Sequence, residues 1–381
     1  MKIYLALVAF FLMAFGLYTL LMAMANIVHF GNIKRKAKLQ RDGKLVSVVM
    51  AARNEEMNLP RVMDSLLKQS YKNLEILVID DESTDHTWDI LKSYAEKDSR
   101  VRIFQSDSSL ERAHNGKVNA LMQVMPHARG EYLYETDADT EHGVDAVAFA
   151  YSVMNSSNLD FITGIPKQRC GSYMASVNIS PMMLIMICLP HFFEHFIRIP
   201  SLTVAVGQFI MMKKSCYDDV GGYESIKNRV CEDMAIASRF VKMGKKYQFV
   251  NISKHVCCYM YSNSRQAFNG ISRMIKGTVP MSFASIPIVA LIVLLFFHMI
   301  AGPVISLIIP LWHQYFLQMA LITFGWVSFY LTWFVSSLVC GFQISVALSG
   351  PVALFQTVMM YIYSLYMKLT GKNFIWKGRQ I

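Results

Sequence analysis

Charged residues are scarce in this sequence. Only 17% of its 381 residues are Asp, Glu, Lys or Arg, whereas 54% are hydrophobic. That balance indicates a membrane protein. The hydrophobic residues gather at 3–30 and 283–367, and the stretch between them holds most of the acidic residues. We therefore expect apolar segments at both ends of the chain and a soluble α/β domain between them.

Cysteines with a metal-ligand spacing are also missing. The seven cysteines form an odd set without paired spacing, so we interpret them as free thiols that pack as small hydrophobic groups. No nucleic-acid-binding module is present either. The net charge of +10 comes from cations beside apolar stretches and in the C-terminal tail, where attraction to anionic lipid explains them without nucleic acid.

The first apolar stretch, residues 3–30, carries no Asp, Glu, Lys or Arg and exceeds the ~20 residues that cross a bilayer. We expect it to be retained, because a signal peptide has a shorter apolar core and a small-residue cleavage site. An excess of cations beside a span marks its cytoplasmic side. The middle domain is therefore predicted to be cytosolic, since the span is followed by Lys34, Arg35, Lys36, Lys38, Arg41 and Lys44.

Strands and helices alternate from residue 45 onward. Strand-like runs LVSVVMA, LEILVID, VRIFQ and EYLYE are separated by helical runs such as LPRVMDSLLKQSY and TWDILKSYAEK. This alternation predicts an α/β domain with a doubly wound, mostly parallel sheet. In such sheets ligands bind beyond the carboxyl ends of the strands, which is where AARNEE, DDES and DAD fall.

Two apolar regions leave alternatives open. Residues 181–212 are interrupted by prolines and by His191, Glu194, His195 and Arg198, so we favour an interfacial or cleft-lining segment over a span. The C-terminal runs 283–312, 316–340 and 345–367 precede a basic tail that should be cytoplasmic, which requires an even number of passes. Either the first run folds as a hairpin at Gly302-Pro303 or one run does not cross.

Pairs of carboxylates follow the predicted strands. Asp80 and Asp81 end one strand, Asp137 and Asp139 end another, and Glu232 with Asp233 open a later helix. A single pair is explained as well by a solvated strand end or by the helix dipole. Three pairs on elements that converge on one crevice favour a site. Asp137 and Asp139 could bind Mg²⁺ or Mn²⁺, which takes one or two carboxylates together with substrate phosphates.

These residues carry a resemblance to a known family. AARNEE, DDESTD, the DAD at 137–139 and the ED at 232–233 resemble, in order and spacing, the family 2 glycosyltransferases of the GT-A fold. The resemblance covers residues 45–277. The runs HNGKVNAL, VAVGQFIMMKKSCYDDVGGYESI, VCEDMAIA and the tail WKGRQ look like the membrane subgroup that glucosylates carotenoid, isoprenoid or hopanoid acceptors.

The resemblance implies a role for each matching position. The donor nucleotide would contact Ala52, Arg53, Glu55 and Asp81, with Lys117 and Asp137 also on the donor side. Asp137 and Asp139 would be the metal ligands. Asp233, beside Glu232, would be the general base that takes the proton of the acceptor hydroxyl, and one base without a covalent intermediate means inversion. Gln208 would face the acceptor or the sugar in this scheme, and an ordinary strand glutamine is an equal interpretation.

The sequence departs from the family after the proposed base. Processive synthases carry Gln-x-x-Arg-Trp there, whereas this chain has Arg265-Gln266-Ala267-Phe268-Asn269. This weakens a processive reading and leaves Arg265 and Arg273 as the nearest partners for the diphosphate. His191 and His195 have the i, i+4 spacing of a helical metal site but lack a third ligand.

The sequence thus predicts an inner-membrane, multi-pass, inverting glycosyltransferase that moves a sugar, glucose by resemblance, from a UDP-sugar to a lipid-like hydroxyl. The alternatives are a cell-envelope polysaccharide synthase or polyprenyl-phosphate glycosyltransferase and, from another class, an inactive membrane scaffold. The predicted organisation is a span at 1–30, a basic linker at 31–44, a GT-A domain at 45–280, transmembrane helices at 281–368 and a basic tail at 369–381.

Overall fold

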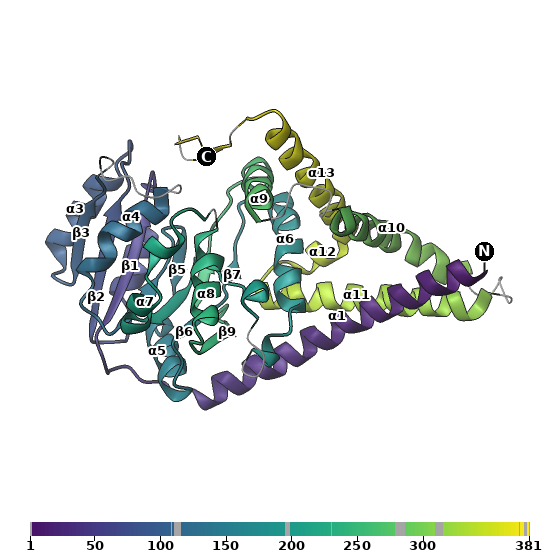
Figure 1. Ribbon diagram of the computed structural model, residues 1–381, viewed down its shortest axis with the longest axis horizontal. Coiled ribbons are helices and arrows are strands. Elements are labelled where there is room, and N and C mark those ends of the chain that lie inside the picture. The colour runs from purple at the N-terminus through teal and green to yellow at the C-terminus, as the bar shows by residue number, and fades with distance from the viewer. Residues whose placement is uncertain are drawn as a thin grey trace. The chain divides into compact units, whose positions relative to one another are not determined.

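The computed structural model describes residues 2–107, 109, 116–194, 199–229, 231–278, 286–308, 315–372, 374–376 and 379–380. The chain forms two compact units, a sheet unit and a helical unit (Figure 1). The sheet unit comprises His29–Gln168, His191–Met260 and Ile375–Ile381. The helical unit comprises Met1–Val28, Arg169–Pro190 and Tyr261–Phe374.

The sheet unit is organised by one seven-stranded sheet of order β3-β2-β1-β4-β8-β6-β9. Its pairs are parallel except for β8, which runs antiparallel to both β4 and β6. The prediction of a mostly parallel α/β sheet of the GT-A type is therefore confirmed. The strands are β1 Val46–Ala52, β2 Leu74–Asp80, β3 Val101–Gln105, β4 Tyr132–Glu135, β6 Phe161–Ile165, β8 Ile210–Lys213 and β9 Tyr247–Asn251.

Helices cover both faces of this sheet because its central strands are buried along their whole length. Every residue of β2 is buried. On one face, Val48 and Val78 share a core with α2 and α5. Side chains alternate across a strand, so the neighbours of these valines face the other side, where α4 contacts β1 and β2. The covering helices are α2 Leu59–Leu67, α3 Thr87–Lys97, α4 Gly116–Val124 and α5 Ala146–Ser156.

Shorter elements complete the sheet unit at the carboxyl end of β4. A three-stranded sheet joins β5 Thr140–His142, β10 Val256–Cys258 and β7 Lys167–Gln168. Two helices follow later in the chain, α7 Lys214–Asp219 and α8 Glu232–Lys242. Glu232 and Asp233 lie in the first turn of α8, as the sequence predicted.

Close helix packing defines the helical unit. Gly16 of α1 lies against the backbone of Gly325 in α11, and a Cβ at either glycine would meet backbone atoms of the other helix closer than 3.0 Å. Small residues of this kind let membrane helices approach closely. The helices are α1 Lys2–Lys36, α6 Tyr173–Cys188, α9 Ser264–Thr278, α10 Ile286–Ile308, α11 Phe316–Cys340, α12 Ile344–Leu348 and α13 Gly350–Leu369.

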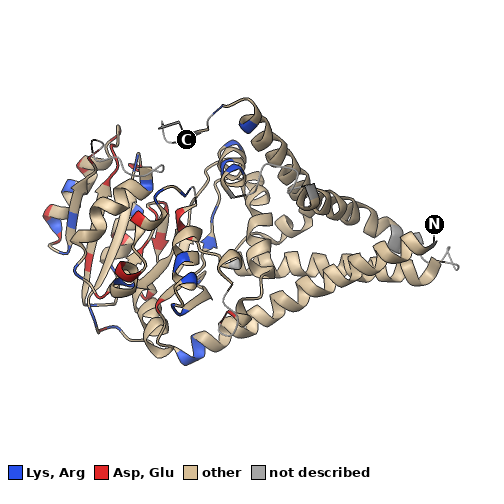
Figure 2. Cartoon of the chain, viewed as in Figure 1, with Lys and Arg blue, Asp and Glu red and all other residues tan. Residues whose placement is uncertain are grey.

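Five helical stretches are long and apolar enough to cross a membrane: Ile3–Lys36, Tyr173–Phe193, Pro287–Val304, Phe316–Cys340 and Gly350–Leu369. Asp, Glu, Lys and Arg are missing from α10 and α11, whereas both signs of charge are spread over the sheet unit (Figure 2).

Four features differ from the predicted ones. Helix α1 continues past residue 30 to Lys36, so the linker is shorter than 31–44. Helix α10 runs unbroken through Gly302-Pro303, and the predicted alternative of a hairpin there is wrong. The apolar segment 181–212 is divided, because its first part continues α6 in the helical unit and the part from His191 belongs to the sheet unit. Likewise α9 belongs to the helical unit, although the predicted domain extended to residue 280.

Candidate functional site

The carboxyl ends of β1, β2 and β3 meet at one edge of the sheet. The amide of Asp81 donates to the carbonyl of Ala52 over 2.8 Å, which joins the ends of β2 and β1. The hydroxyl of Ser106 then donates to Oδ1 of Asp81 over 3.3 Å. Ala52 and Asp81 are both buried. These strand ends, expected to line a nucleotide pocket, are thus brought together.

Arg53 and Glu55 fix the loop that follows β1. A guanidinium nitrogen of Arg53 donates to the carbonyls of Asp81 and Glu82, the residues that follow β2. The amide of Glu55 donates to the hydroxyl of Thr87 over 2.8 Å, at the start of α3. The two loops therefore support each other, and Arg53 contributes to that support through backbone oxygens.

Lys117 lies among three carboxylates. Its Nζ is 2.7 Å from Oδ1 of Asp137, 3.2 Å from Oε1 of Glu232 and 3.7 Å from Oε1 of Glu135. These acids come from the end of β4 and the start of α8, and Lys117 comes from the first turn of α4. The structure therefore gathers Lys117, Asp137 and Glu232, which the sequence could only place on separate elements.

Burial and charge act on this cluster in opposite directions. Burial alone would lower the pKa of Lys117, but the carboxylates of Asp137, Glu232 and Glu135 together raise it, so the ammonium stays charged. Burial raises the pKa of Glu135 to about 7 against the opposing charge of Lys117. One lysine thus partly neutralises a group of acids that would otherwise repel one another.

Asp233 is held by two backbone amides. Gly207 N donates to Oδ2 over 3.1 Å, and Met234 N donates to Oδ1 over 2.7 Å. Burial, followed by the neighbouring charge of Glu232, raises the pKa of Asp233 to about 7. A carboxylate with a pKa near the working pH is suited to accept and release a proton.

Gly207 faces the space between Asp137, a candidate metal ligand, and Asp233, the candidate base. A Cβ at this position would lie 3.1 Å from Nζ of Lys117, 3.6 Å from Oδ2 of Asp137 and 3.7 Å from Oδ2 of Asp233. The glycine therefore leaves room where the ammonium of Lys117 and the carboxylates of Asp137 and Asp233 converge. Both aspartates face the same small space.

Asp137 and Asp139 lie on the turn between β4 and β5, separated by one residue. In the part of the chain that the structure describes, no three His, Cys, Asp or Glu residues are grouped to hold a metal ion. Two carboxylates fit Mg²⁺ or Mn²⁺ when phosphate and water oxygens complete the coordination shell. The thiol of Cys258 is 3.7 Å from Oδ1 of Asp139, and burial raises the pKa of this thiol.

Other predicted residues are placed differently. Gln208 is buried in the turn between Val206 and Phe209, and its Oε1 accepts a hydrogen bond from Gln168 over 3.3 Å, so it is not in a strand. Arg265 and Arg273 lie on α9 in the helical unit, and their assignment to the diphosphate stays a prediction.

The histidine pair at 191 and 195 was a weak candidate for a metal site. His191 is buried, stacks on Phe249 at 4.1 Å between ring centroids, and lies with Nδ1 2.6 Å from Glu194. His195 lies outside the described residues. His191 thus takes part in packing and in a hydrogen bond to Glu194.

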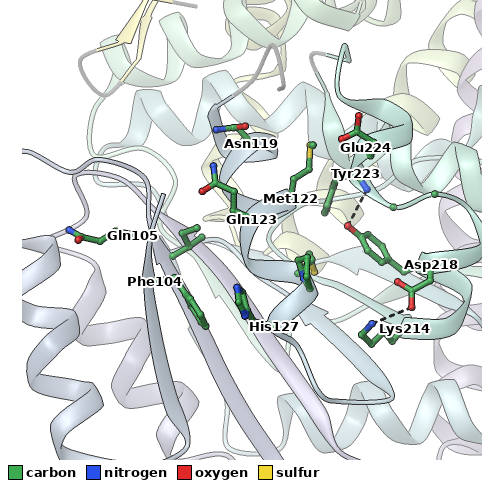
Figure 3. Close-up of a pocket in the computed structure, with 16 residues that line it drawn as sticks. Phe104, Gln105, Asn119, Met122, Gln123, His127, Lys214, Asp218, Tyr223 and Glu224 are labelled. Atoms are coloured by element: carbon green, nitrogen blue, oxygen red, sulfur yellow. Dashed lines mark hydrogen bonds and ion pairs between the residues drawn. The ribbon is translucent and has the colours of Figure 1, made fainter. Parts of the chain in front are cut away.

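Sequence reasoning missed Glu135 and Tyr223. The Tyr223 hydroxyl donates to Oε2 of Glu135, and both side chains are fully buried. The only sequence signal was an acid that ends an apolar strand directly before the DAD turn. Tyr223 also lines a groove of about 800 Å³ that passes α4, with Phe104, Gln123 and His127 on one side and Lys214 and Asp218 on the other (Figure 3).

Comparison with known proteins finds similarity to glycosyltransferases. The family model described as glycosyl transferase family 2 matches residues 47–221. EpsE of Bacillus subtilis (strain 168), which is named as a glycosyltransferase, is 30% identical over 213 residues, or 53% of this chain and 68% of EpsE. The beta-monoglucosyldiacylglycerol synthase of Nostoc sp. (strain PCC 7120) is 33% identical over 133 residues, or 34% of this chain and 28% of the synthase.

A solved structure, the mannosyltransferase PcManGT from Pyrobaculum calidifontis in complex with GDP-Man and Mn²⁺, superposes with a TM-score of 0.49 at 16% identity. That superposition covers 94% of this chain and 98% of PcManGT. Among the curated relatives, some matches are partial, since the Nostoc synthase is matched over less than a third of its length.

Proposed function

The chain belongs to glycosyl transferase family 2, and we propose that it is an inverting enzyme that transfers a sugar from a UDP-sugar to the hydroxyl group of a lipid at the membrane surface. One observation carries the proposal. Asp137 on the donor side and Asp233 on the acceptor side face one small space that Gly207 keeps free of a side chain.

Asp233 is the general base in this proposal. Its carboxylate accepts the proton of the acceptor hydroxyl while the hydroxyl oxygen forms a bond to the anomeric carbon. The bond from that carbon to the diphosphate oxygen breaks on the opposite face, so the configuration inverts. The amides of Gly207 and Met234 hold the carboxylate in place, and its pKa near 7 suits proton transfer at neutral pH.

Asp137 and Asp139 would hold the divalent cation, Mg²⁺ or Mn²⁺. When bound, such a cation supplies positive charge for the departing diphosphate. Lys117 adds a second positive charge beside Asp137. The nucleotide would lie along Ala52, Arg53, Glu55 and Asp81, where the ends of β1 and β2 are joined.

The acceptor class is proposed from the helical unit. Apolar helices would keep the catalytic domain at the membrane. An acceptor that is itself confined to the membrane, such as a lipid, would then be within its reach. The name of the Nostoc relative includes a glucosyldiacylglycerol, which supports glucose as the sugar and a lipid as the acceptor. An inactive scaffold explains the cluster poorly, because it has no use for several acids gathered around a single lysine.

The connections of the sheet unit restrict its membrane topology. The chain leaves this unit after Gln168, forms α6 and returns at His191, and β6 and β8 on either side of α6 are hydrogen-bonded neighbours. One complete pass by α6 would put these two strands on opposite sides of the bilayer. We therefore propose that α6 lies at the interface, as the sequence favoured.

Two crossings after the sheet unit return the tail to the cytosol. In the helical unit, α13 begins with Gly350 against Met299, in the middle of α10, and ends with Ser364 bonded to Ser272 of α9 over 2.7 Å. This start halfway along its neighbour supports a helix that does not cross completely, although α13 is long and apolar enough to do so. We propose that α1, α10 and α11 span the inner membrane and that the sheet unit is cytosolic.

The test combines lipid analysis with transfer by the purified protein. Total lipids from cells with and without the gene are compared by mass spectrometry, and detergent-solubilised protein is incubated with radiolabelled UDP-glucose and the lipid extract. We expect a glycolipid that depends on the gene and on active protein. Label that enters only polymer, or a lipid profile identical in both strains together with no transfer in vitro, would overturn the proposal.

A further inference from the structure

A buried polar network lies directly beneath the candidate metal turn. Nδ1 of His142 is 3.1 Å from the hydroxyl of Tyr134, and Nε2 is 3.1 Å from Oγ1 of Thr136 and 3.0 Å from Oγ1 of Thr140. All four side chains are buried. Buried polar groups need partners, so the protons of this network can be assigned.

Each threonine hydroxyl has a single hydrogen, and a carbonyl oxygen already takes it. Thr136 donates to the carbonyl of Gln208 over 3.0 Å, and Thr140 donates to the carbonyl of Asp137 over 2.7 Å. The two hydroxyl oxygens also lie 3.0 Å apart, and a bond between them would leave one of the two carbonyls without its donor. With both hydrogens on the carbonyls, both hydroxyls accept from His142, so its Nε2 carries the hydrogen. Nδ1 is left as an acceptor, and it receives the hydrogen of Tyr134.

Burial agrees with this assignment. It lowers the pKa of His142 to about 3, so the ring is neutral and carries one hydrogen at physiological pH. One tautomer therefore satisfies every member of the network.

The two threonines are hydrogen-bonded to the two halves of the site, the metal turn and the turn beside the base. Through Asp137, Thr140 holds the turn that carries the candidate metal ligands. Through the carbonyl of Gln208, Thr136 holds the turn in which the preceding residue, Gly207, donates its amide hydrogen to Asp233. We infer that His142, Thr136 and Thr140 are positioning residues that fix the metal turn and the base relative to each other. This inference rests on the proposed function, which gives both turns their roles.

The first test separates the hydroxyl from the shape of the side chain at position 136. Thr136→Val keeps the shape but leaves the Gln208 carbonyl without its donor, whereas Thr136→Ser keeps the hydroxyl. We expect Val to lower kcat about tenfold or more, because small misplacements of a catalytic group cost that much, with donor KM changed by less than about threefold. Ser should retain most of kcat. Equal kcat in the Val and Ser variants would overturn the inference.

The second test uses position 140 and a readout other than activity. Thr140→Val should weaken binding of Mn²⁺ with UDP in calorimetry by about tenfold, while Thr140→Ser retains it. Ser152→Ala removes an equally buried hydroxyl outside the site, which donates to the Ala148 carbonyl within α5 and accepts from the Gln40 amide, and it should leave both kcat and binding unchanged. The inference would be overturned by unchanged binding in Thr140→Val. It would also be overturned by losses in Ser152→Ala as large as those in the threonine variants, because the threonines would then have only a general role in stability.

The third test needs no turnover. In spectra of ¹⁵N-histidine-labelled protein, the resonance that disappears in His142→Gln should show a neutral ring with its hydrogen on Nε2, and any other tautomer would contradict the network. Failure of the proposed function can be distinguished from failure of this inference, because it would appear as normal activity in Asp233→Asn. Failure of this inference would leave Asp233→Asn inactive and Thr136→Val active.

Discussion

The backbone amide of Gly207 donates a hydrogen bond to Oδ2 of Asp233 over 3.1 Å. This bond links the turn that precedes β8 to the first turn of α8. It orients the proposed base from a residue that has no side chain of its own, so the space in front of the carboxylate stays open.

The role of Asp233 can be tested by Asp233→Asn. The amide cannot take the acceptor's proton, so turnover should fall by about 10²–10⁴-fold. UDP affinity, measured by calorimetry, should change little, because the nucleotide contacts are assigned to other residues. Asp145→Asn, which alters an acid bonded to Ser70 and Arg41 outside the site, serves as the control. Near-normal transfer in Asp233→Asn would remove this residue from the mechanism.

Gly207→Ala tests the open space. The added methyl would lie 3.1 Å from Nζ of Lys117 and between the carboxylates of Asp137 and Asp233. We expect kcat/KM for the donor to fall by about 10²-fold, since displacements near 1 Å cost that much. The melting temperature should stay close to that of the unaltered protein, because the atom nearest to the added methyl is the flexible end of a lysine.

Gly143→Ala is the matched control for this change. Its Cβ would meet its nearest neighbour, the His255 carbonyl, at an ordinary 3.4 Å. Both activity and melting temperature should stay close to those of the unaltered protein. A Gly207→Ala variant as active as Gly143→Ala would show that the space is not used.

Lys117→Met tests the charge balance of the cluster. Without the ammonium, the carboxylates of Asp137 and Glu232 attract a free cation more strongly, so Mn²⁺ should bind about tenfold more tightly in the absence of nucleotide. Electron paramagnetic resonance of free Mn²⁺ measures this affinity. Lys213→Met, which breaks an ion pair with Asp160, should leave Mn²⁺ binding unchanged. Weaker binding in Lys117→Met would mean that the lysine does not compete with the cation.

Dependence on the metal is a separate expectation. Transfer should stop in excess chelator and return with Mg²⁺ or Mn²⁺, and Asp139→Ala should stay folded but inactive. Circular dichroism and the rate of transfer provide the two measurements. Full activity in chelator would exclude the proposed metal site.

Topology can be checked with reporters at three positions. A reporter after residue 44 and one after residue 381 should both report the cytoplasm, and one inserted between α10 and α11 should report the outside. The expectation follows from two crossings after the sheet unit. A tail that reports the outside would mean that α13 also crosses.

Much of the sheet unit was predictable because its signals are local. The helix predicted from TWDILKSYAEK is α3, and the acids at 232–233 do open α8, since apolar periodicity and helix starts depend on neighbouring residues. The partners of the cluster were not predictable. Lys117 reaches Asp137 and Glu232 only because α4 and α8 are brought to the end of β4, and no spacing in the sequence encodes that approach.

The membrane segments were also predictable only in part. Apolar length identified the helices, but it could not tell a crossing from an interfacial segment, because both bury apolar side chains. His142 gave no signal either, since a histidine in a short strand has no distinctive neighbours. Its importance follows only from the hydrogen bonds of Thr136 and Thr140.

The place of β8 in the sheet has a consequence for the order in which the chain folds during synthesis. β8 fits between β4 and β6, yet it is made after α6. Until the ribosome has passed Lys213, β4 and β6 each expose an edge that can pair with another chain. Closure of the sheet therefore waits for an apolar helix to find its place. A nascent chain denied a bilayer should stall with two open edges and aggregate.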